Sequence, residues 1–449
     1  MRPLYHPSVY DERTTAPSYW EESAPPALDD LTPLNGEESC EVAVIGGGYT
    51  GLSAALHLAR DHGVDVRLLE AGPIGWGASG RNGGFCGLAA TKLSLDAMIK
   101  RYGLEETKRF YESQLEAIEL VEALARDEEI DYERRGDGYL EVAHHPSRFA
   151  GLAEEGETLS RLFGIETKLM TAEEFAEVGF QSQEQFGALR LAVGFALHPL
   201  KFARGLGEAA RRWGAVLHPD SRVLDWRREG ARHHLVTAEG ALRADKVILA
   251  ANGFLQDGLM KAFDRRILPA LSNIITTRPL SDQELAAHHW RTDDPICNTR
   301  HMLFYFRMLP DRRFLFGARG DLTGRPADSE KMRAWMVRRL GEVFPHWRDV
   351  EITHFWRGLV CLTRDLTPAV GLLPDDPSVA YGFGYHANGV NTAPWTGRAL
   401  ARLVAGNQRD QNALPRVVTG LPPRFPFAAL RPWYLGAAFA YYRWLDARG

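Results

Sequence analysis

Residues 40–51, with the sequence Cys-Glu-Val-Ala-Val-Ile-Gly-Gly-Gly-Tyr-Thr-Gly, are the most informative part of the chain. Residues 41–45 form a short apolar run typical of a buried strand, and residues 52–60 have the apolar spacing of a helix. A second strand-like run follows at residues 65–70 and ends at Glu70. The segment therefore predicts a β-α-β unit whose strand-to-helix turn carries the pattern GxGxxG.

Each part of this turn has a physical role in binding a dinucleotide. Gly46 permits the tight turn, Gly48 lets a pyrophosphate approach the backbone, and Gly51 allows close packing of helix and strand. The helix start offers N–H groups and a positive dipole end to phosphate. A purely structural glycine turn is the less favoured alternative. The cofactor contacts expected in this unit are Gly46, Gly48, Tyr49, Thr50, Gly51, Glu70 and Ala71, with Glu70 accepting hydrogen bonds from ribose.

A second glycine-rich stretch, residues 75–84, indicates FAD in place of NAD. An NAD-binding unit would continue with a helix and a strand, whereas this loop suits a cofactor that extends beyond its adenosine half. Trp76 and Phe85 argue against a flexible linker. Arg81 is expected to pair with a phosphate, and a solvated surface position is an equally weighted alternative. The predicted cofactor contacts here are Ser79, Arg81, Asn82, Gly83 and Gly84.

Composition limits the classes of protein to consider. The 449 residues are 45% hydrophobic and 25% charged, which is typical of a soluble globular protein with two or three domains. The formal net charge of -5 disfavours a nucleic-acid partner. No secretory signal or spanning segment is evident, and the four cysteines form no zinc pattern, so we expect a cytoplasmic protein with reduced thiols and without a metal.

The order of strand and helix patterns indicates an α/β (α+β) protein in which a Rossmann-like FAD domain is interleaved with a β-rich substrate domain. Dinucleotide-type segments recur near residues 40, 220–250 and 380, and dense strand patterns occupy 265–320. The expected division is an N-terminal arm (1–37), an FAD domain (38–90, 195–262 and 350–410), a substrate domain (91–194 and 263–349), and a C-terminal tail with a helix (411–449).

The glycine fingerprint, Glu70 and residues 77–84 (Gly-Ala-Ser-Gly-Arg-Asn-Gly-Gly) resemble the D-amino-acid-oxidase superfamily of FAD enzymes. This superfamily includes glycine oxidase, sarcosine oxidase and gamma-glutamylputrescine oxidase, and the last group is the most similar. Residues 18–20, 197–199, 244–253 and 381–390 extend the resemblance over nearly the whole chain. The resemblance implies oxidation of a C–N bond in an amine or amino acid. It also implies that Val223 contacts the adenine, and Ala251 is a further predicted cofactor contact.

Residues 385–392 precede a predicted helix with Pro394 near its first turn. The positive end of this helix would lie at the pyrimidine side of the flavin and favour its reduced form. Asn388, Gly389 and Val390 are the predicted contacts. Relatives usually carry Gly-His-Gly here, whereas this chain has Ala-Asn-Gly, so any role for His386 as a replacement stays open beside that of a loop histidine.

The substrate side is predicted from two strand patterns that mix aromatic residues with arginine, residues 304–307 and 314–319. Aromatic walls would desolvate an amine, and arginine would hold a carboxylate. An ordinary sheet with one packed and one solvated face is the alternative. No lysine lies between residues 305 and 330, near where the resemblance places an oxygen-activating lysine. The catalytic candidates are His386, Arg319, Tyr305 and Arg307.

Cys361, the C-terminal helix and the function each allow more than one interpretation. Cys361 lies before a Thr-Pro pair as in sarcosine oxidase, but a buried core residue is favoured over covalent flavin attachment. The C-terminal helix, about 432–447, is expected to dock on the protein body, with a membrane-surface contact as the alternative. A 2-hydroxyacid oxidoreductase and a non-catalytic flavin-binding subunit are the competing functions, and the sequence does not indicate an oligomeric state.

Overall fold

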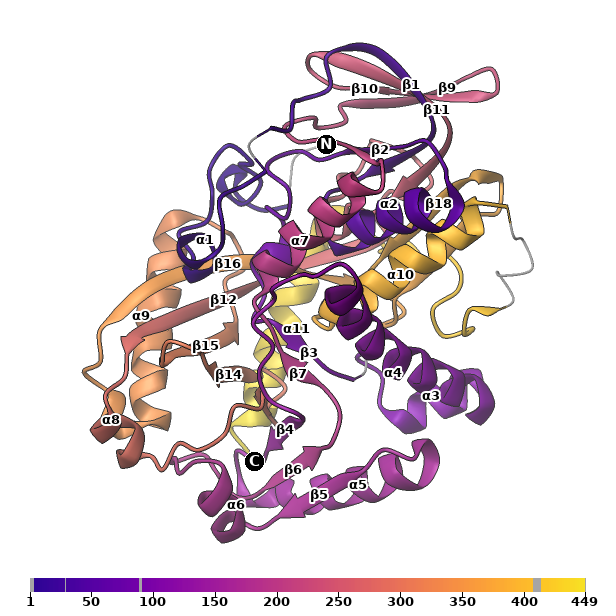
Figure 1. Ribbon diagram of the computed structural model, residues 1–449. Coiled ribbons are helices and arrows are strands. Elements are labelled where there is room, and N and C mark those ends of the chain that lie inside the picture. Colours follow the sequence, from indigo (N-terminus) through magenta and orange to yellow (C-terminus); the bar gives the residue numbers. More distant parts are fainter. Residues whose placement is uncertain (1–3, 29, 89–90, 407–412, 449) are drawn as a thin grey trace.

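Two eight-stranded sheets organise the computed structural model, which describes residues 4–28, 30–88, 91–406 and 413–448 (Figure 1). A pair of short strands, β3 (Phe85–Cys86) and β7 (Phe195–Ala196), forms a third, two-stranded sheet. Both large sheets collect strands from distant parts of the sequence. The predicted α/β class is therefore confirmed.

The first sheet is open and mostly parallel, and its centre is β1 (Gly36–Ile45). This strand pairs in parallel with β2 (Val66–Leu69) and with β11 (Gly240–Leu249). Val42 and Val44 pack into one apolar cluster while Ala43 and Ile45 pack into another, so both faces of β1 are buried. The other strands are β8 (Val216–His218), β18 (Asp376–Phe383), β17 (Ala369–Leu373), β10 (Arg232–Val236) and β9 (Asp225–Glu229).

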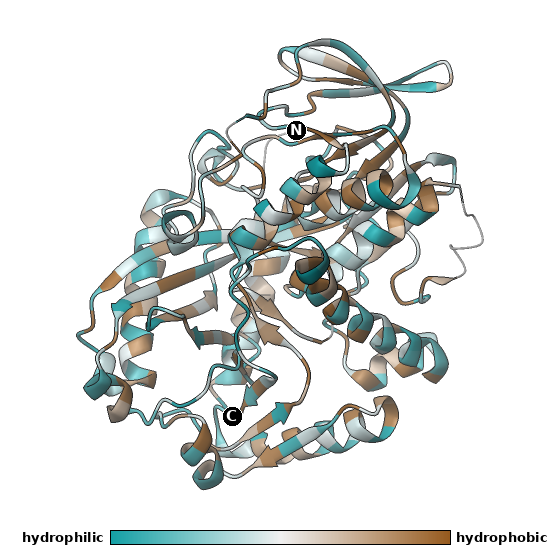
Figure 2. Ribbon diagram, viewed as in Figure 1, coloured by the Kyte–Doolittle hydropathy of each residue, from teal (hydrophilic) through white to brown (hydrophobic). Residues whose placement is uncertain are grey.

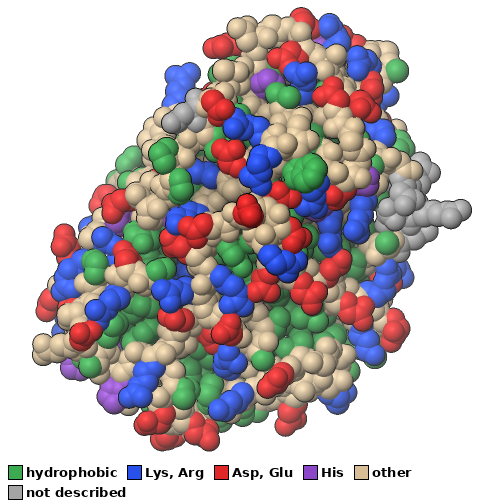
Figure 3. Space-filling model, viewed as in Figure 1, with side chains coloured by type: hydrophobic (Ala, Val, Ile, Leu, Met, Phe, Trp, Pro, Cys, Tyr) green, Lys and Arg blue, Asp and Glu red, His purple; other side chains and the backbone are tan. Residues whose placement is uncertain are grey.

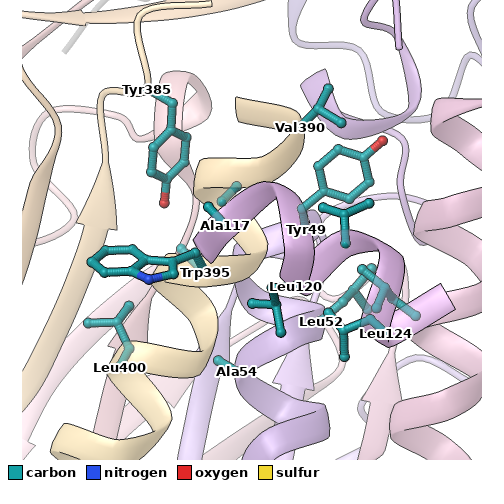
Figure 4. Packing of buried hydrophobic residues seen from close by; sticks show 14 of the residues in the cluster. Tyr49, Leu52, Ala54, Ala117, Leu120, Leu124, Tyr385, Val390, Trp395 and Leu400 are labelled. Atoms are coloured by element: carbon teal, nitrogen blue, oxygen red, sulfur yellow. The ribbon is translucent and has the colours of Figure 1, made fainter. Parts of the chain in front are cut away.

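A layer of helices packs on one face of this sheet. α2 (Tyr49–His62) packs against α7 (Pro199–Arg212) and α10 (Gly389–Val404), and α10 also packs against α4 (Leu104–Asp127). The short α3 (Leu95–Tyr102) lies against α4. Figure 4 shows side chains of α2, α4 and α10, among them Leu52, Leu120 and Trp395, in one shared core. This core fixes the first turns of α2 and α10 relative to each other.

The second sheet is mostly antiparallel, with two long strands, β12 (Ile267–Pro279) and β16 (Ile352–Thr363), at one end. From β12 the order continues with β15 (Arg313–Arg319), β14 (Phe304–Met308), β13 (Ile296–Asn298), β4 (Tyr139–Val142), β6 (Ala188–Leu191) and β5 (Thr167–Met170). α9 (Pro326–Val343) packs on an aromatic face of the sheet, and brown, apolar strands mark the interior in Figure 2. The remaining helices are α5 (Phe149–Phe163), α6 (Ala172–Val178) and α8 (Asp282–Ala287).

The predicted interleaving matches the strand order, but two boundaries need correction. β16 pairs along its length with β12, so residues 352–363 belong to the second sheet and the change of sheet comes after Thr363, not at 349. α4, which we assigned to the substrate domain, packs against α10 beside the first sheet. Neither error was avoidable from local patterns, because strand and helix periodicity do not specify the partner element. The boundary at 410/411 lies outside the described residues.

The arm and the C-terminal helix both dock on the body. In α1 (Tyr19–Ser23), Trp20 is 1% exposed and lies in a cluster with Leu315 and Trp356. α11 (Arg431–Asp446) buries Leu435 and Phe439 against the second sheet. Docking of this helix on the body was the favoured prediction, yet most of its aromatic side chains are exposed. The exposed aromatics are Trp433, Tyr441, Tyr442 and Trp444.

On the face shown in Figure 3, basic and acidic side chains are intermingled. Within the described part of the chain, none of the helices combines the length and the apolar character needed to cross a membrane. All four cysteines are free thiols.

Candidate cofactor and substrate site

A cavity of about 690 Å³ is lined by residues of both large sheets. The first sheet contributes residues at the carboxyl ends of β1, β2 and β11, the edge at which open α/β sheets bind their ligands. The second sheet contributes side chains from β4, β12, β13, β14, β15 and β16. A ligand that fills the cavity therefore contacts both halves of the fold.

The turn between β1 and α2 leaves no room for side chains at its glycines. Gly46 has φ +114°, and a Cβ there would lie 2.8 Å from the carbonyl oxygen of Ala250. A Cβ on Gly51 would collide with the carbonyl oxygen of Gly46, and a Cβ on Gly48 would lie 2.8 Å from Ser79 Oγ. The turn thus brings bare backbone and the N-terminus of α2 to the cavity, where first-turn N–H groups can bind an anion.

Glu70 lies directly after β2 and lines the cavity beside this turn. Its carboxylate accepts hydrogen bonds from the N–H groups of Gly47 and Gly72. Burial raises the pKa of Glu70, while those N–H groups act to lower it. The side chain therefore fastens the glycine turn to the next strand, and its predicted bond to ribose stays a prediction.

The second glycine-rich stretch forms a loop that is cross-linked by its own side chains. Ser79 Oγ accepts a hydrogen bond from Tyr49 N at 2.9 Å, which joins the loop to the first turn of α2. Asn82 Nδ2 donates to the Ser79 carbonyl at 2.9 Å, and Asn82 Oδ1 accepts from Gly84 N at 2.7 Å. Asn82 thus shapes the loop with both ends of its amide.

Tryptophans hold the same loop from outside. Trp356 Nε1 donates to the carbonyl of Arg81 at 2.9 Å, and Trp20 Nε1 donates to the carbonyl of Asn82 at 2.9 Å. Arg81 itself donates from Nε to the Trp76 carbonyl at 2.7 Å and lies 4.2 Å above the Trp76 ring. Burial lowers the pKa of Arg81 to about 10. The guanidinium is therefore held against the cavity wall and is not a free surface group.

Most predicted cofactor contacts converge on the cavity. Two do not reach it, because Gly51 packs against Gly46, and Gly84, with φ +76°, packs against the Leu197 carbonyl. Val223 lies in the segment before β9 and lines the cavity from there. The predicted contacts that line the cavity are Gly46, Gly48, Tyr49, Thr50, Glu70, Ala71, Ser79, Arg81, Asn82, Gly83, Val223, Ala251, Asn388, Gly389 and Val390.

The turn before α10 is conformationally strained at the cavity wall. His386 and Ala387 have φ +51° and +78°, values that non-glycine residues adopt at a cost of roughly 1–3 kcal/mol each. Asn388 Nδ2 donates to the Gly87 carbonyl at 2.8 Å, which fixes the start of the helix. Burial, with a smaller effect from Lys92, lowers the pKa of His386 to about 3. His386 is therefore neutral near pH 7, and positive potential at this point comes from Lys92, Arg319 and the helix end.

Two of the predicted substrate residues face the cavity from neighbouring strands. Tyr305 on β14 shares a hydrogen bond with Ser272 Oγ at 2.9 Å, and burial raises its pKa to about 12. Arg319, at the end of β15, is opposite Ser272 in the strand register. Its Nη2 is buried and has no hydrogen-bond partner among the described residues. Burial also lowers the pKa of Arg319, as expected for an unpaired cation enclosed by protein.

Arg307 does not belong to this wall, which corrects our prediction. Its Nη2 donates to the Leu197 carbonyl at 2.6 Å, and the guanidinium lies 5.4 Å from the ring of Trp20. Because Leu197 N also donates to the Gly84 carbonyl, Arg307 supports the glycine-rich loop from behind. The strand pattern located Arg307 on the correct face of β14 but did not specify how far along the strand the cavity extends.

Comparison with known proteins agrees with this geometry. Residues 41–403 match the model of the DAO family, described as FAD dependent oxidoreductase. The chain belongs to the DAO family of FAD-dependent oxidoreductases. It is 32% identical over 423 residues to gamma-glutamylputrescine oxidoreductase of Escherichia coli (strain K12), covering 93% of this chain and 95% of that protein. It is 23% identical over 387 residues to glycine oxidase of Bacillus subtilis (strain 168), covering 83% and 95%.

Solved structures share the fold of this chain. Glycine oxidase from Bacillus cereus ATCC 14579 superimposes with a TM-score of 0.68 at 20% identity, covering 86% of this chain and 100% of that one. L-Proline dehydrogenase from P. horikoshii gives a TM-score of 0.67 at 20% identity, covering 83% and 94%. These likenesses establish the architecture of this DAO-family chain.

Lys92 and Glu141 are charged residues of the cavity that the sequence of this DAO-family chain did not point to. Lys92 lies in a segment without strand or helix pattern, so no periodicity drew attention to it. Glu141 belongs to the predicted strand at 138–143, and an acidic residue on a strand is usually solvated. The one available signal was its position between apolar neighbours, Leu140 and Val142, which are buried on the other face.

The wall of the cavity fits the FAD that the DAO family uses. Bare glycine backbone and the α2 N-terminus suit a pyrophosphate, and the Glu70 carboxylate suits ribose hydroxyls. At the other end, His386 Nδ1 is buried without a partner among the described residues. Cys361 also lines the cavity, but burial raises the pKa of its thiol to about 12, so the thiolate is disfavoured.

Proposed function

We propose that this enzyme oxidises a C–N bond of an amine or amino acid that carries a carboxylate, by hydride transfer to the flavin. Gamma-glutamylputrescine-like compounds and N-alkyl amino acids are the preferred substrates. The similarity to gamma-glutamylputrescine oxidoreductase and glycine oxidase supports this class. FAD-binding residues are proposed to be the predicted contacts that line the cavity, named above.

The observation that carries the proposal is the unpaired guanidinium of Arg319. Its buried Nη2 lacks a partner among the described residues, although leaving a buried charged donor unsatisfied costs roughly 1–3 kcal/mol or more. A substrate carboxylate would remove that cost with a charge-assisted hydrogen bond. Tyr305 lies beside it on the next strand and would desolvate the bound amine.

Bound FAD would supply the electron-accepting chemistry, and the protein would orient the substrate and handle its proton. The amine has to be neutral when its carbon gives up hydride, since an ammonium nitrogen has no lone pair to stabilise the developing cation. Neutral His386 and the apolar ring of Tyr305 would favour the uncharged amine. The Arg319 guanidinium would hold the carboxylate away from the reacting carbon.

Anaerobic mixing of the purified holoenzyme with a panel of amines and amino acids tests the proposal. We expect the flavin absorbance to bleach with amines that carry a carboxylate and to persist with isosteric amides. Arg319→Met should raise KM for these substrates about 100-fold or more, as expected for loss of a charge-assisted bidentate contact. Arg313→Met is the matched control, because Arg313 lies on the same strand but pairs with Asp311 outside the cavity.

Two outcomes would contradict the proposal. Bleaching by lactate or another 2-hydroxyacid, with no response to any amine, would indicate C–OH oxidation on the same fold. Bound FAD that no small amine or hydroxyacid bleaches would indicate a flavin-binding subunit without its own substrate. Admitting air after bleaching would then distinguish an oxidase from a dehydrogenase.

A further inference from the structure

Three ionisable residues connect the substrate side of the cavity with the surface of the second sheet. Lys92 and Glu141 line the cavity, while Glu155 lies on the outer helix α5 and is exposed to solvent. Oxidation of an ammonium substrate at a neutral nitrogen leaves one proton to be removed from this enclosed space. The arrangement of these three side chains bears on where that proton goes.

Strand register places Glu141 beneath α5. On β4, Glu141 is directly paired with Leu189 of β6 on one side and Cys297 of β13 on the other. Directly paired residues project from the same face of a sheet. Leu189 projects towards α5, since a Cβ on Gly156 would lie 2.7 Å from Leu189 Cδ1. Glu141 therefore extends from the face that α5 covers.

The glycine at position 156 allows α5 to approach this face closely, and the preceding residue, Glu155, reaches Glu141. The two carboxyl groups act on each other's pKa, and a hydrogen bond between them would require a proton on one of them. Burial, and then the neighbouring Glu155, raise the pKa of Glu141. Although Glu155 is exposed as a residue, desolvation of its carboxyl group also raises its pKa. The pair therefore retains a proton at a pH where isolated carboxyl groups are ionised.

Lys92 is the cationic neighbour of this pair, and it lines the cavity. Burial, and then the Arg319 guanidinium, lower the pKa of Lys92 to about 7, while Cys297 and Glu141 act in the opposite direction. The groups that face it are Arg319 from β15, Cys297 from β13, Glu141 from β4, and His386 from the turn before α10. A lysine in this setting can accept and release a proton near neutral pH.

We propose that Lys92, Glu141 and Glu155 form a proton path from the substrate cavity to the surface. The inference rests on the proposed function, since the proton in question is that of the substrate ammonium. The N–H bond of the ammonium breaks and its proton joins the neutral amine of Lys92. With FAD bound, the flavin would accept the carbon-bound hydrogen with its two electrons as hydride, which would leave the substrate as an iminium. The proton on Lys92 moves to the carboxylate of the Glu141–Glu155 pair, and Glu155 releases a proton to solvent.

Proton release during a single anaerobic turnover tests the path in the holoenzyme. With a pH-indicator dye in weak buffer, protons should appear in the wild type together with flavin bleaching. In Glu155→Gln we expect proton appearance to lag behind bleaching by about tenfold or more, since general acid–base groups contribute factors of 10²–10⁴. Glu154→Gln is the matched control, because Glu154 is exposed on the same helix but has no part in the pair. It should behave as the wild type.

Direct titration of Lys92 supplies a readout that does not depend on turnover. After reductive ¹³C-methylation, the Lys92 resonance, assigned by its loss in Lys92→Met, should titrate near pH 7 in the wild type. Glu141→Gln should lower the midpoint of this titration because it removes a negative charge, and Glu154→Gln should leave it unchanged.

The outcomes separate this inference from the proposed function. A midpoint near the ordinary value of 10.5, or a Glu155→Gln variant identical to Glu154→Gln in proton release, would overturn the path even if amines bleach the flavin. Absence of bleaching with every amine would overturn the proposed function, while the shifted titration of Lys92 would persist.

Discussion

At the residue scale, the glycine turn makes a sharp prediction about stability and cofactor content. Gly51→Ala should displace α2 from β1, because the added Cβ would collide with the Gly46 carbonyl oxygen. We expect a loss of roughly 1–3 kcal/mol in the free energy of unfolding, together with loss of bound FAD. Gly151→Ala, on the open side of α5, is the control; it should leave the FAD content unchanged and raise the free energy of unfolding by up to about 1 kcal/mol. Urea unfolding and flavin absorbance would measure the two effects.

Cys361 provides a second prediction at this scale. Because burial raises the pKa of its thiol to about 12, little thiolate is available to form a bond to the flavin. Denaturing the holoenzyme in acid should therefore release yellow flavin into the supernatant. Yellow colour that stays with the precipitated protein in the wild type, but not in Cys361→Ser, would show that the expectation is wrong.

Individual residues also show what a sequence can and cannot predict. Gly46, Gly48 and Glu70 were identifiable because a dinucleotide turn permits few residue types at those positions. Lys92 and Glu141 were not identifiable, because their residue types and local sequence patterns are common. Their shifted pKa values arise from the surrounding residues of the cavity. Arg307 had the right chemistry, but its guanidinium is committed to the Leu197 carbonyl.

At the scale of elements, α11 is held by a small apolar face. Phe439→Ala should destabilise its docking by about 3–5 kcal/mol, the usual cost of removing a buried Phe side chain. Trp433→Ala, at a residue that is 76% exposed, should cost no more than about 0.5 kcal/mol. Limited proteolysis near residue 427 would report undocking of the helix. Equal sensitivity of the two variants would mean that the exposed aromatic face also contributes.

The docking of α11 should also depend on pH. Burial alone would raise the pKa of Asp446, but the N–H groups of Met302 and His301 and the His301 ring hold it below its usual range. A depressed folded-state pKa stabilises the docked helix above the unfolded value, roughly 3.9, and this contribution is lost as pH falls through the folded value. Proteolysis at α11 should therefore increase in acid, and Asp446→Asn should remove that acid dependence while weakening docking at pH 7.

Helices and strands were predictable where the spacing of apolar residues was regular. The elements against which they pack were not predictable. The helix expected at 52–60 lies within α2, and the strands expected at 41–45 and 65–70 correspond to β1 and β2. The docking face of α11 was missed because aromatic residues occur all around the helix, so hydrophobicity alone did not distinguish the face that contains Leu435 and Phe439. The partner of β16 was missed because sheet membership depends on contacts far apart in sequence.

At the scale of the whole molecule, the cavity wall joins the two large sheets. A cofactor bound there should stabilise both halves together. Adding FAD to the apoprotein at 100 times its Kd should raise the free energy of unfolding by about 2.7 kcal/mol. Calorimetry should show one transition that moves to higher Tm. An unchanged Tm at saturating FAD, or a shift in only one of two transitions, would contradict a site shared by the two sheets.

The indole rings around the glycine-rich loop have a spectroscopic consequence. Trp20 and Trp356 donate to the carbonyls of Asn82 and Arg81, and Trp76 lines the cavity itself. Flavins absorb light in the range where tryptophan emits, so excitation energy would pass from these rings to a bound flavin. The ultraviolet-excited emission of the protein thus serves as a built-in gauge of how much of a preparation carries its cofactor.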